Sequence, residues 1–144
     1  MPNPLPKALA CPLATGATTH PSALAIVSNT TEYTYLQCYS QARAWAHFLQ
    51  ETYHLHAGDR IAIVTQPTCE LIGLLFACFY AGIIVCPLST RLPIPAVIES
   101  YKNDQCKLLI SDTPLNGCAS LLIQDLPKAP LVSSVAPHQF YYQQ

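Results

Sequence analysis

A run of uncharged, mostly apolar residues from Leu71 to Leu88 constrains the fold more than any other stretch of this sequence. About 18 consecutive apolar residues can span a bilayer, so a transmembrane helix has to be considered first. Gly73 and Gly82 interrupt the run, and Pro87 stands near its end. A helix followed by a buried strand explains this pattern better than a membrane span does. We therefore expect no membrane span.

The residues around this run carry clear helix signals. Apolar residues recur every three or four positions from Tyr35 to about His54, which predicts an amphipathic helix. Thr34 and Gln37 stand at the spacing of a capping box at the start of that helix. In the apolar run itself, Thr68 is the expected N-cap and Gly82 the expected left-handed cap at the carboxyl end. A further helix is predicted from residue 93 to about 102, opened by two prolines.

Short apolar segments lie between these helices and are predicted to be strands. They occupy residues 23–27, 32–34, 61–65, 83–86, 108–111 and 121–123. The first two are expected to pair as a short amino-terminal hairpin. We interpret Ile83–Cys86, which is continuously apolar, as a strand buried on both faces. Strands that alternate with helices at this spacing predict an α/β fold, with an open, doubly wound, mostly parallel sheet flanked by helices.

The composition shifts along the chain suggest three segments. Residues 1–22 are rich in Pro, Thr and Ala and are expected to be an irregular amino-terminal segment. Residues 23–126 would form the α/β subdomain. Residues 127–144 are expected to be a Pro-rich connector followed by the start of a further strand at Gln139.

The charge of the chain excludes some functions and suggests that other protein covers part of its surface. Charged residues make up 10% of the sequence and the net charge is -1, whereas about 25% is usual for a soluble domain. Such a low fraction is found in membrane proteins and in soluble cores whose outer surface is partly covered by further protein. The seven Lys and Arg residues are scattered, so no basic patch for nucleic acid is predicted.

The cysteines and histidines do not predict a metal site. None of the seven cysteines forms a Cys-x-x-Cys pair, and His54 and His56 have no third ligand nearby in the sequence. We interpret the cysteines as reduced core thiols of a cytoplasmic protein.

The sequence also lacks a phosphate-binding loop and a recognisable nucleophile. The five glycines are too far apart for a P-loop or a dinucleotide fingerprint. No serine or cysteine has the sequence context of a strained nucleophile elbow. Ser89 follows a predicted strand, and the carboxyl end of a strand is the better place to look for a site. No catalytic residue is predicted.

Several segments in a fixed order resemble the amino-terminal portion of the adenylate-forming (AMP-binding) acyl-CoA synthetases. The similarity covers about residues 20–125, and the stretch from Ala81 to Pro95 is most similar to the 2-succinylbenzoate–CoA ligases of menaquinone synthesis. The segments that carry it are Thr34-Tyr35, Gly58-Asp59-Arg60-Ile61-Ala62-Ile63, Tyr80-Ala81-Gly82, Pro87-Leu88, Arg91-Leu92-Pro93-Ile94-Pro95 and Leu108-Leu109-Ile110-Ser111-Asp112.

The resemblance implies a two-step ligase reaction and a subdomain of a larger adenylating enzyme. A carboxylate attacks the α-phosphate of ATP to give an acyl-adenylate and pyrophosphate, and the thiol of coenzyme A then displaces AMP. The implied cofactors are ATP, magnesium and coenzyme A. The family uses a Ser/Thr/Gly-rich phosphate loop, an acid that positions ATP and a lysine on a mobile carboxyl-terminal domain. None of these can be placed on a residue of this chain, so the isolated chain is expected to be inactive and to bind no cofactor tightly.

Only one group of residues is a candidate for cofactor contact. Ser89, Thr90 and Arg91 follow a predicted strand and, by the resemblance, could face the channel for the phosphates of coenzyme A. A guanidinium can bind phosphate through two hydrogen bonds; the alternative is an ordinary surface arginine.

Three hypotheses for the whole chain remain open at this point, and the third is a membrane-associated protein through Leu71–Leu88. The first is the amino-terminal fragment of an acyl-CoA ligase, whose partner is the missing carboxyl-terminal part of the enzyme or, through an exposed apolar face, a second copy of the chain. The second is a stand-alone binding or regulatory module that keeps the fold without catalysis. Self-association counts against the module, because exposed apolar patches beyond a few hundred Å² tend to aggregate.

Overall fold

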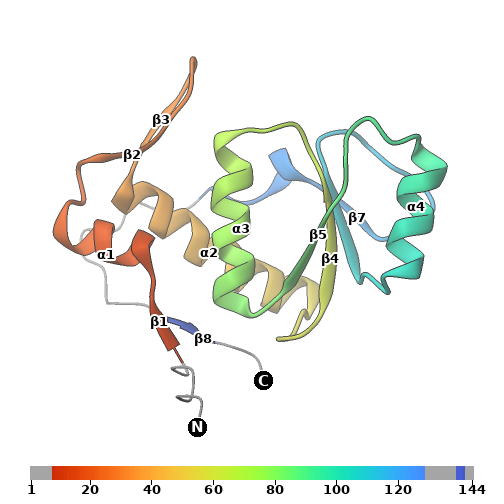
Figure 1. The fold of residues 1–144 in the computed structure, drawn as a ribbon, viewed down its shortest axis with the longest axis horizontal. Helices are drawn as coiled ribbons and strands as arrows, with labels where there is room; N and C mark the ends of the chain where they lie inside the picture. The colour runs from red at the N-terminus through yellow and green to blue at the C-terminus, as the bar shows by residue number, and fades with distance from the viewer. Residues whose placement is uncertain (1–7, 129–138, 142–144) are drawn as a thin grey trace, which may run out of the picture.

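The computed structural model describes residues 8–128 and 139–141. Its centre is a parallel sheet of four strands in the order β5-β4-β6-β7, with α2 and α3 on one face and α4 on the other (Figure 1). The α/β fold with helices on both faces of an open parallel sheet is therefore confirmed. The sheet strands are β4 (Arg60–Val64), β5 (Ile84–Pro87), β6 (Leu108–Ser111) and β7 (Ser120–Leu122).

The remaining elements surround this sheet or lie before it in the chain. The helices are α1 (Pro12–Thr19), α2 (Tyr35–Tyr53), α3 (Cys69–Ala81), α4 (Ile94–Asn103) and the short 3₁₀ helix η1 (Ile123–Asp125). The strands outside the sheet are β1 (Ala8–Ala10), β2 (Leu24–Val27), β3 (Glu32–Thr34) and β8 (Gln139–Tyr141).

Alternating side chains of the central strands fill two separate cores. Ile61 and Ile63 of β4 pack with α2 and α3, in a cluster that includes Trp45 and Leu74. The side chain between them, Ala62, packs on the opposite face in the cluster formed with α4. This two-residue alternation is the geometry of a pleated strand, and it lets one strand support both helix layers.

The two long helices begin and end where the cap signals predict. The Thr34 hydroxyl accepts a hydrogen bond from Gln37 N at 3.2 Å, and the Gln37 side chain accepts one from Thr34 N at 2.9 Å. At α3 the Thr68 hydroxyl alone caps the helix, and it accepts a hydrogen bond from Leu71 N at 3.3 Å. Gly82 ends that helix with φ 70°, in the left-handed region that glycine adopts at low cost.

The interpretation of residues 83–86 as a strand buried on both faces is wrong. β5 is an edge strand that pairs only with β4, and Ile84 on it is 43% exposed. The strand buried on both faces is β6, in which all four residues are buried. Apolar composition cannot distinguish the two positions, because the strand order depends on how the chain crosses over after each helix.

The expectation that residues 1–22 are irregular is also wrong in part. Residues 12–19 form α1, and β1 pairs with β8 in an antiparallel ribbon. The N-cap of α1 is Cys11, whose sulfur accepts a hydrogen bond from Ala14 N at 3.4 Å. Cysteine is not among the usual capping residues, so the sequence hides the helix start, although Pro12 at the first turn is a known signal. The strand expected from Gln139 is present as β8.

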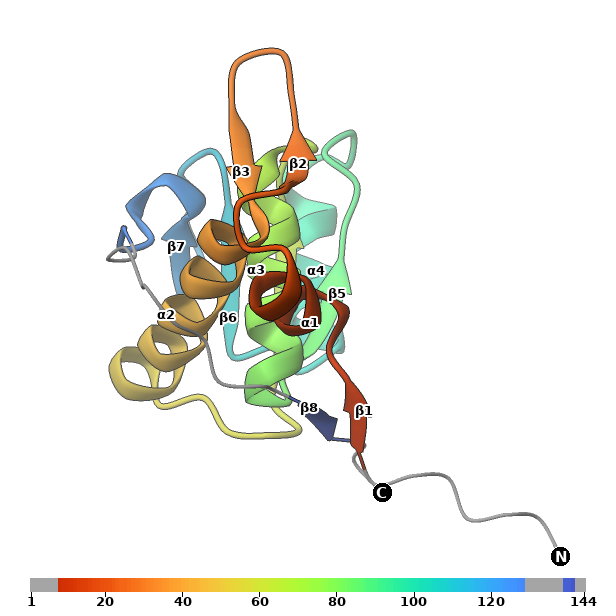
Figure 2. The same cartoon turned by 90° about the vertical axis from the view of Figure 1, so that its left-hand side faces the viewer.

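The predicted hairpin is formed by β2 and β3 and extends beyond the body of the molecule (Figure 2). Within the described residues, no helix is both long and apolar enough to cross a membrane. The apolar run that raised this question divides into α3 and β5.

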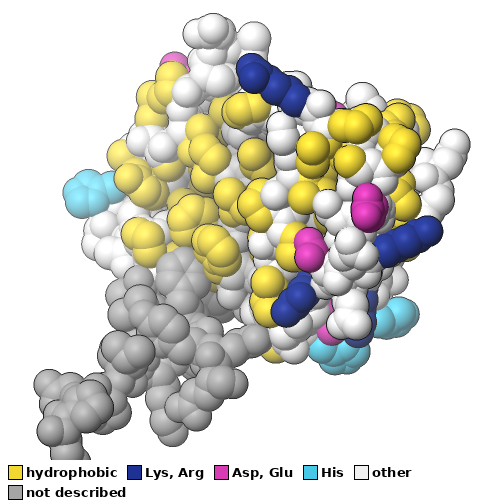
Figure 3. Space-filling view, turned by 45° about the vertical axis from the view of Figure 1, so that its right-hand side comes forward, with side chains coloured by type: hydrophobic (Ala, Val, Ile, Leu, Met, Phe, Trp, Pro, Cys, Tyr) yellow, Lys and Arg dark blue, Asp and Glu magenta, His cyan; other side chains and the backbone are white. Residues whose placement is uncertain are grey.

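Exposed hydrophobic side chains gather on α3, on β5 and on the segment that leads into α4. Ile72, Phe79, Ile84, Leu92 and Ile94 are each 39–55% exposed. The space-filling view shows hydrophobic side chains spread across this face, with charged side chains toward its lower right (Figure 3).

Candidate functional site

The carboxyl ends of the four parallel strands lie at one edge of the sheet, and polar residues follow each of them. Gln66 lies just beyond β4, Ser89–Arg91 beyond β5, Asp112 beyond β6 and Gln124 beyond β7. Sheets of this type bind ligands at this edge, because the loops there are free to vary while the strands hold them in place.

Hydrogen bonds tie these loops together. Gln66 N donates to Asp112 Oδ2 at 2.9 Å, and Gln66 Nε2 donates to Thr90 Oγ1 at 3.1 Å. Gln124 Nε2 donates to the carbonyl oxygen of Asp112 at 3.4 Å. Asp112 and Gln66 therefore connect the ends of all four strands into one polar rim.

The three residues named from the sequence, Ser89, Thr90 and Arg91, lie on this rim, and Thr90 and Arg91 are exposed. The Ser89 hydroxyl accepts a hydrogen bond from Arg91 N at 3.1 Å, and Leu92 N donates to the Ser89 carbonyl at 3.2 Å. These bonds close a tight turn. The assignment of this turn to coenzyme binding stays a prediction.

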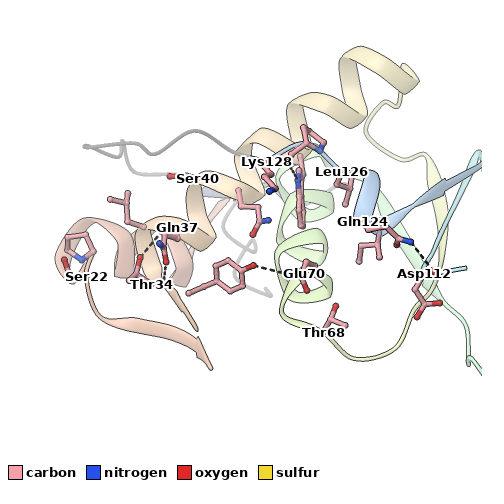
Figure 4. Close-up of a pocket in the computed structure, with 17 residues that line it drawn as sticks. Ser22, Thr34, Gln37, Ser40, Thr68, Glu70, Asp112, Gln124, Leu126 and Lys128 are labelled. Atoms are coloured by element: carbon pink, nitrogen blue, oxygen red, sulfur yellow. Dashed lines mark hydrogen bonds between the residues drawn. The ribbon is translucent and has the colours of Figure 1, made fainter. Parts of the chain in front are cut away.

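A cavity of about 770 Å³ opens beside this rim (Figure 4). Its walls come from the β3 end of the hairpin, from α2, from the first turn of α3 and from the segment that follows β7. Asp112 and Gln124 belong both to the rim and to the cavity lining. The volume lies within the range of about 300–1,000 Å³ that is common for small-molecule sites.

The inner wall of the cavity is apolar and closely packed. Trp45 is 2% exposed, and its Nε1 donates to the carbonyl oxygen of Pro127 at 2.7 Å. Ile123 and Leu126, which follow β7, are 8% and 7% exposed and also line the cavity. The indole N–H is thus satisfied within the wall, and the ring itself is almost fully buried behind it.

The polar part of the lining is centred on Glu70 in the first turn of α3. The Tyr33 hydroxyl donates to Glu70 Oε1 at 3.2 Å. Burial and the neighbouring charge of Glu70 both raise the pKa of Tyr33, because each disfavours the phenolate. Ser40 on α2 is also a lining residue. Its hydroxyl oxygen is itself buried and, within the described part of the chain, has no hydrogen-bond partner.

Two of the core thiols, Cys78 and Cys38, have no features of nucleophiles. Burial raises the pKa of Cys78 to about 12 and that of Cys38 to about 11, so neither thiol ionises near neutral pH. Their role as small core residues is confirmed, since both are at most 2% exposed. The described residues contain no group of three or more His, Cys, Asp or Glu side chains that could hold a metal ion.

Sequence reasoning found the turn at Ser89–Arg91 but missed the cavity. The residues that build it lie far apart in the chain: Tyr33 and Glu70 are 37 positions apart, and Trp45 and Pro127 are 82 apart. The only sequence signal was Asp112 directly after a predicted strand, which places a carboxylate at the ligand-binding edge of the sheet.

Comparison with known proteins gives one family for most of the chain. The sequence model of the family described as AMP-binding enzyme matches residues 13–141. A 2-succinylbenzoate–CoA ligase of Oceanobacillus iheyensis is 28% identical over 78 residues, which are 54% of this chain and 16% of the ligase. A plipastatin synthase polypeptide of Bacillus subtilis is 29% identical over 132 residues, which are 85% of this chain and 5% of that protein.

Solved structures share the fold at lower identity. O-succinylbenzoate coenzyme A synthetase of Bacillus subtilis, in complex with AMP, superposes with a TM-score of 0.76 at 18% identity, over 91% of this chain and 35% of that one. The amino-terminal subdomain of NpsA from Klebsiella oxytoca, in complex with 3-hydroxybenzoyl-AMSN, gives a TM-score of 0.71 at 24% identity, over 86% of this chain and 35% of that one. The chain therefore spans about a third of these solved structures and less than a fifth of the two curated relatives.

Proposed function

Because the chain belongs to the AMP-binding enzyme family, whose sequence model matches residues 13–141, we propose that it is the amino-terminal scaffold of an ATP-dependent acyl-CoA ligase. The reaction of the whole enzyme joins a carboxylate to coenzyme A, with cleavage of ATP to AMP and pyrophosphate. We further propose 2-succinylbenzoate as the acid, menaquinone biosynthesis as the pathway and the cytoplasm as the location of the enzyme.

The observation that carries the proposal is that the match covers nearly all of this chain but only part of the matched protein. The superposition on the Bacillus subtilis synthetase includes 91% of this chain but 35% of that protein. The chain thus resembles one part of an adenylating enzyme along nearly its whole length. Two of its curated relatives are 2-succinylbenzoate–CoA ligases, and this supports the choice of acid.

The chemistry of the chain agrees with a scaffold role. Phosphoryl chemistry requires backbone donors and cations that converge on the developing charge. The sequence has no glycine-rich phosphate loop, and the described residues form no metal-ligand cluster. We propose that ATP, magnesium and coenzyme A bind the complete enzyme. The Bacillus subtilis synthetase has itself been solved with ATP and a magnesium ion.

Within that enzyme we assign the turn at Ser89, Thr90 and Arg91 to the channel for coenzyme A. Arg91 is exposed at the carboxyl edge of the sheet, and the turn is held by the Gln66–Thr90 hydrogen bond. A guanidinium fixed at this edge can pair with a phosphate group.

The reading frame that follows the codon of Gln144 tests the ligase proposal. We expect a continuation, in the same or a shifted frame, that encodes a Ser/Thr/Gly-rich loop ending in lysine. The protein encoded by the joined frames should then form the coenzyme A thioester of 2-succinylbenzoate. Absence of such a loop from all three frames would overturn the proposal, and activity on other acids alone would overturn the choice of substrate.

The alternative function, a stand-alone binding module, is favoured by one observation, the formed cavity beside the sheet edge. Size-exclusion chromatography of the purified chain separates the two functions. A scaffold with exposed Ile72, Phe79 and Ile84 is expected to self-associate or to require the rest of the enzyme. A monodisperse, stable monomer would favour the module.

A further inference from the structure

The turn at residues 89–92 follows the edge strand of the sheet. Among the described strands, β5 pairs with β4 alone, so the loop beyond it has a neighbouring strand on one side. The hydrogen bonds from Arg91 N to Ser89 Oγ at 3.1 Å and from Leu92 N to the Ser89 carbonyl oxygen at 3.2 Å are internal to the turn. They fix the shape of the turn but not its place on the rim. A side chain that is to bind a ligand needs a fixed place as well.

Gln66 joins this turn to the rest of the rim. Its Nε2 donates to Thr90 Oγ1 at 3.1 Å, and the two residues are 24 positions apart in the chain. Thr90 is one of the two central residues of the turn, next to Arg91. The bond therefore ties the tip of the turn to the loop that follows β4, the neighbouring strand.

The backbone of Gln66 is itself held on both sides. Gln66 N donates to Asp112 Oδ2 at 2.9 Å, and Asp112 directly follows β6, in which all four residues are buried. Pro67 comes next in the sequence, and the residue before a proline is largely restricted to extended conformations. Thr68 then caps α3. The Gln66 side chain thus starts from a backbone position that a buried strand and a helix start determine.

Hydrogen bonds therefore lead from the buried strand β6 to the loop of the edge strand β5. They run from Asp112 through the backbone and side chain of Gln66 to Thr90. Both Gln66 and Thr90 are exposed, and one neutral hydrogen bond in water contributes little to the stability of a whole domain. Loss of this bond should change the position of the turn more than the folding of the chain.

We propose that Gln66 is a positioning residue for coenzyme A, which holds the turn at residues 89–92 so that Arg91 meets the phosphates of the coenzyme. The inference rests on the proposed ligase function and on the assignment of this turn to the coenzyme channel. Gln66 does not itself touch the coenzyme. It limits the positions that the turn adopts before binding, and such preorganisation lowers the cost of binding.

Amide hydrogen exchange in the purified 144-residue chain tests the positioning directly. Gln66→Ala removes the donor to Thr90 but keeps the backbone bond to Asp112, and Thr90→Val removes the acceptor with little change of shape. Each should speed exchange of the Arg91 and Leu92 amides by about threefold or more, the effect of one lost hydrogen bond. The double variant should exchange no faster than the single ones, because both remove the same bond.

The matched control is Gln50→Ala, at an exposed position of α2. It should leave the exchange of the Arg91 and Leu92 amides within about twofold, as expected for a distant site. Unchanged exchange in Gln66→Ala, or effects of Gln66→Ala and Thr90→Val that multiply in the double variant, would overturn the inference.

Steady-state kinetics of the ligase encoded by the joined frames test the consequence for the coenzyme. Gln66→Ala should raise KM for coenzyme A by about threefold to tenfold, the factor that one hydrogen bond supplies. It should leave KM for ATP and kcat within about twofold, because the turn contributes to binding of the coenzyme alone. Equal changes in all three values would show a general structural role and would refute the positioning.

Arg91→Ala separates failure of this inference from failure of the proposed function. If Arg91→Ala raises KM for coenzyme A and Gln66→Ala does not, the role of Gln66 is refuted and the channel assignment stands. If neither variant raises it, the assignment of the turn to the coenzyme is wrong and the inference falls with it, although thioester formation by the parent enzyme still supports the ligase function.

Discussion

Gly16 shows how a single residue limits the packing of α1 against α2. A Cβ atom added at this position would overlap the Tyr35 ring, which covers the glycine from the first turn of α2. Alanine normally stabilises a helix interior by about 1 kcal/mol relative to glycine. We expect the opposite for Gly16→Ala, a loss of about 1–3 kcal/mol in the free energy of unfolding, because the ring must move. Urea denaturation measures this loss.

The control for Gly16→Ala is a double-mutant cycle with Tyr35→Ala. Removal of the ring frees the space, so Gly16→Ala should be neutral or stabilising in the Tyr35→Ala background. If Gly16→Ala stabilises the protein with Tyr35 in place, the close packing of the Tyr35 ring on Gly16 is contradicted.

Cys78 should make the stability of the fold fall in alkaline solution. Burial raises the pKa of this thiol to about 12, whereas in the unfolded chain it ionises near its usual value of about 8.5. Above that value the unfolded state releases a proton that the folded state keeps. The free energy of unfolding should therefore fall by up to about 1.4 kcal/mol per pH unit on account of this group, between about pH 9 and 12.

Urea denaturation in reductant at pH 8, 9 and 10 measures this effect. Cys78→Ala should reduce the slope of the free energy of unfolding against pH by the contribution of about one proton. Leu74→Val, in the same helix and also fully buried, should lower stability by the same amount at each pH. Identical slopes for the parent chain and Cys78→Ala would refute the assignment.

At the residue scale, the sequence predicted helix caps but not contacts between distant residues. Thr34, Gln37, Thr68 and Gly82 have the cap roles expected of them, because a cap depends on neighbours within four positions. The Cys11–Tyr80 contact, in which sulfur and hydroxyl oxygen lie 2.8 Å apart, joins residues 69 positions apart, and no local pattern encodes it.

At the scale of elements, the capping box of α2 is expected to contribute measurably to stability. Thr34→Ala removes the acceptor for Gln37 N and should lower the free energy of unfolding by about 1 kcal/mol. Thr34→Ser keeps the hydroxyl and should restore most of the loss. Thr19→Ala, at the exposed end of α1, serves as the control and should change stability by less than about 0.5 kcal/mol. A loss in Thr34→Ser as large as in Thr34→Ala would contradict the role of the hydroxyl.

Most elements were predictable because their signals are local. The strands at 32–34 and 108–111 and the helices α2, α3 and α4 lie within about one or two residues of their predicted positions. The two errors have non-local or unusual causes. The position of β5 at the sheet edge depends on chain crossover, and the start of α1 depends on a cysteine cap.

At the scale of the whole molecule, the sheet edge could be predicted but the cavity beside it could not. The order of strands and helices predicts where loops meet, and Ser89–Arg91 lie there. The cavity needs the hairpin, α2, α3 and the segment after β7 to close around one space, which only tertiary packing determines.

The central claim is that this chain is the scaffold of an adenylating ligase and carries out no ligation alone. The most direct measurement is thioester formation by the purified 144-residue chain with 2-succinylbenzoate, ATP, magnesium and coenzyme A, monitored through release of AMP and pyrophosphate. We predict no product above the enzyme-free background, because the sequence has no glycine-rich phosphate loop whose backbone donors would stabilise the charge on the transferring phosphate. ATP-dependent formation of 2-succinylbenzoyl-CoA by the chain alone would contradict the claim.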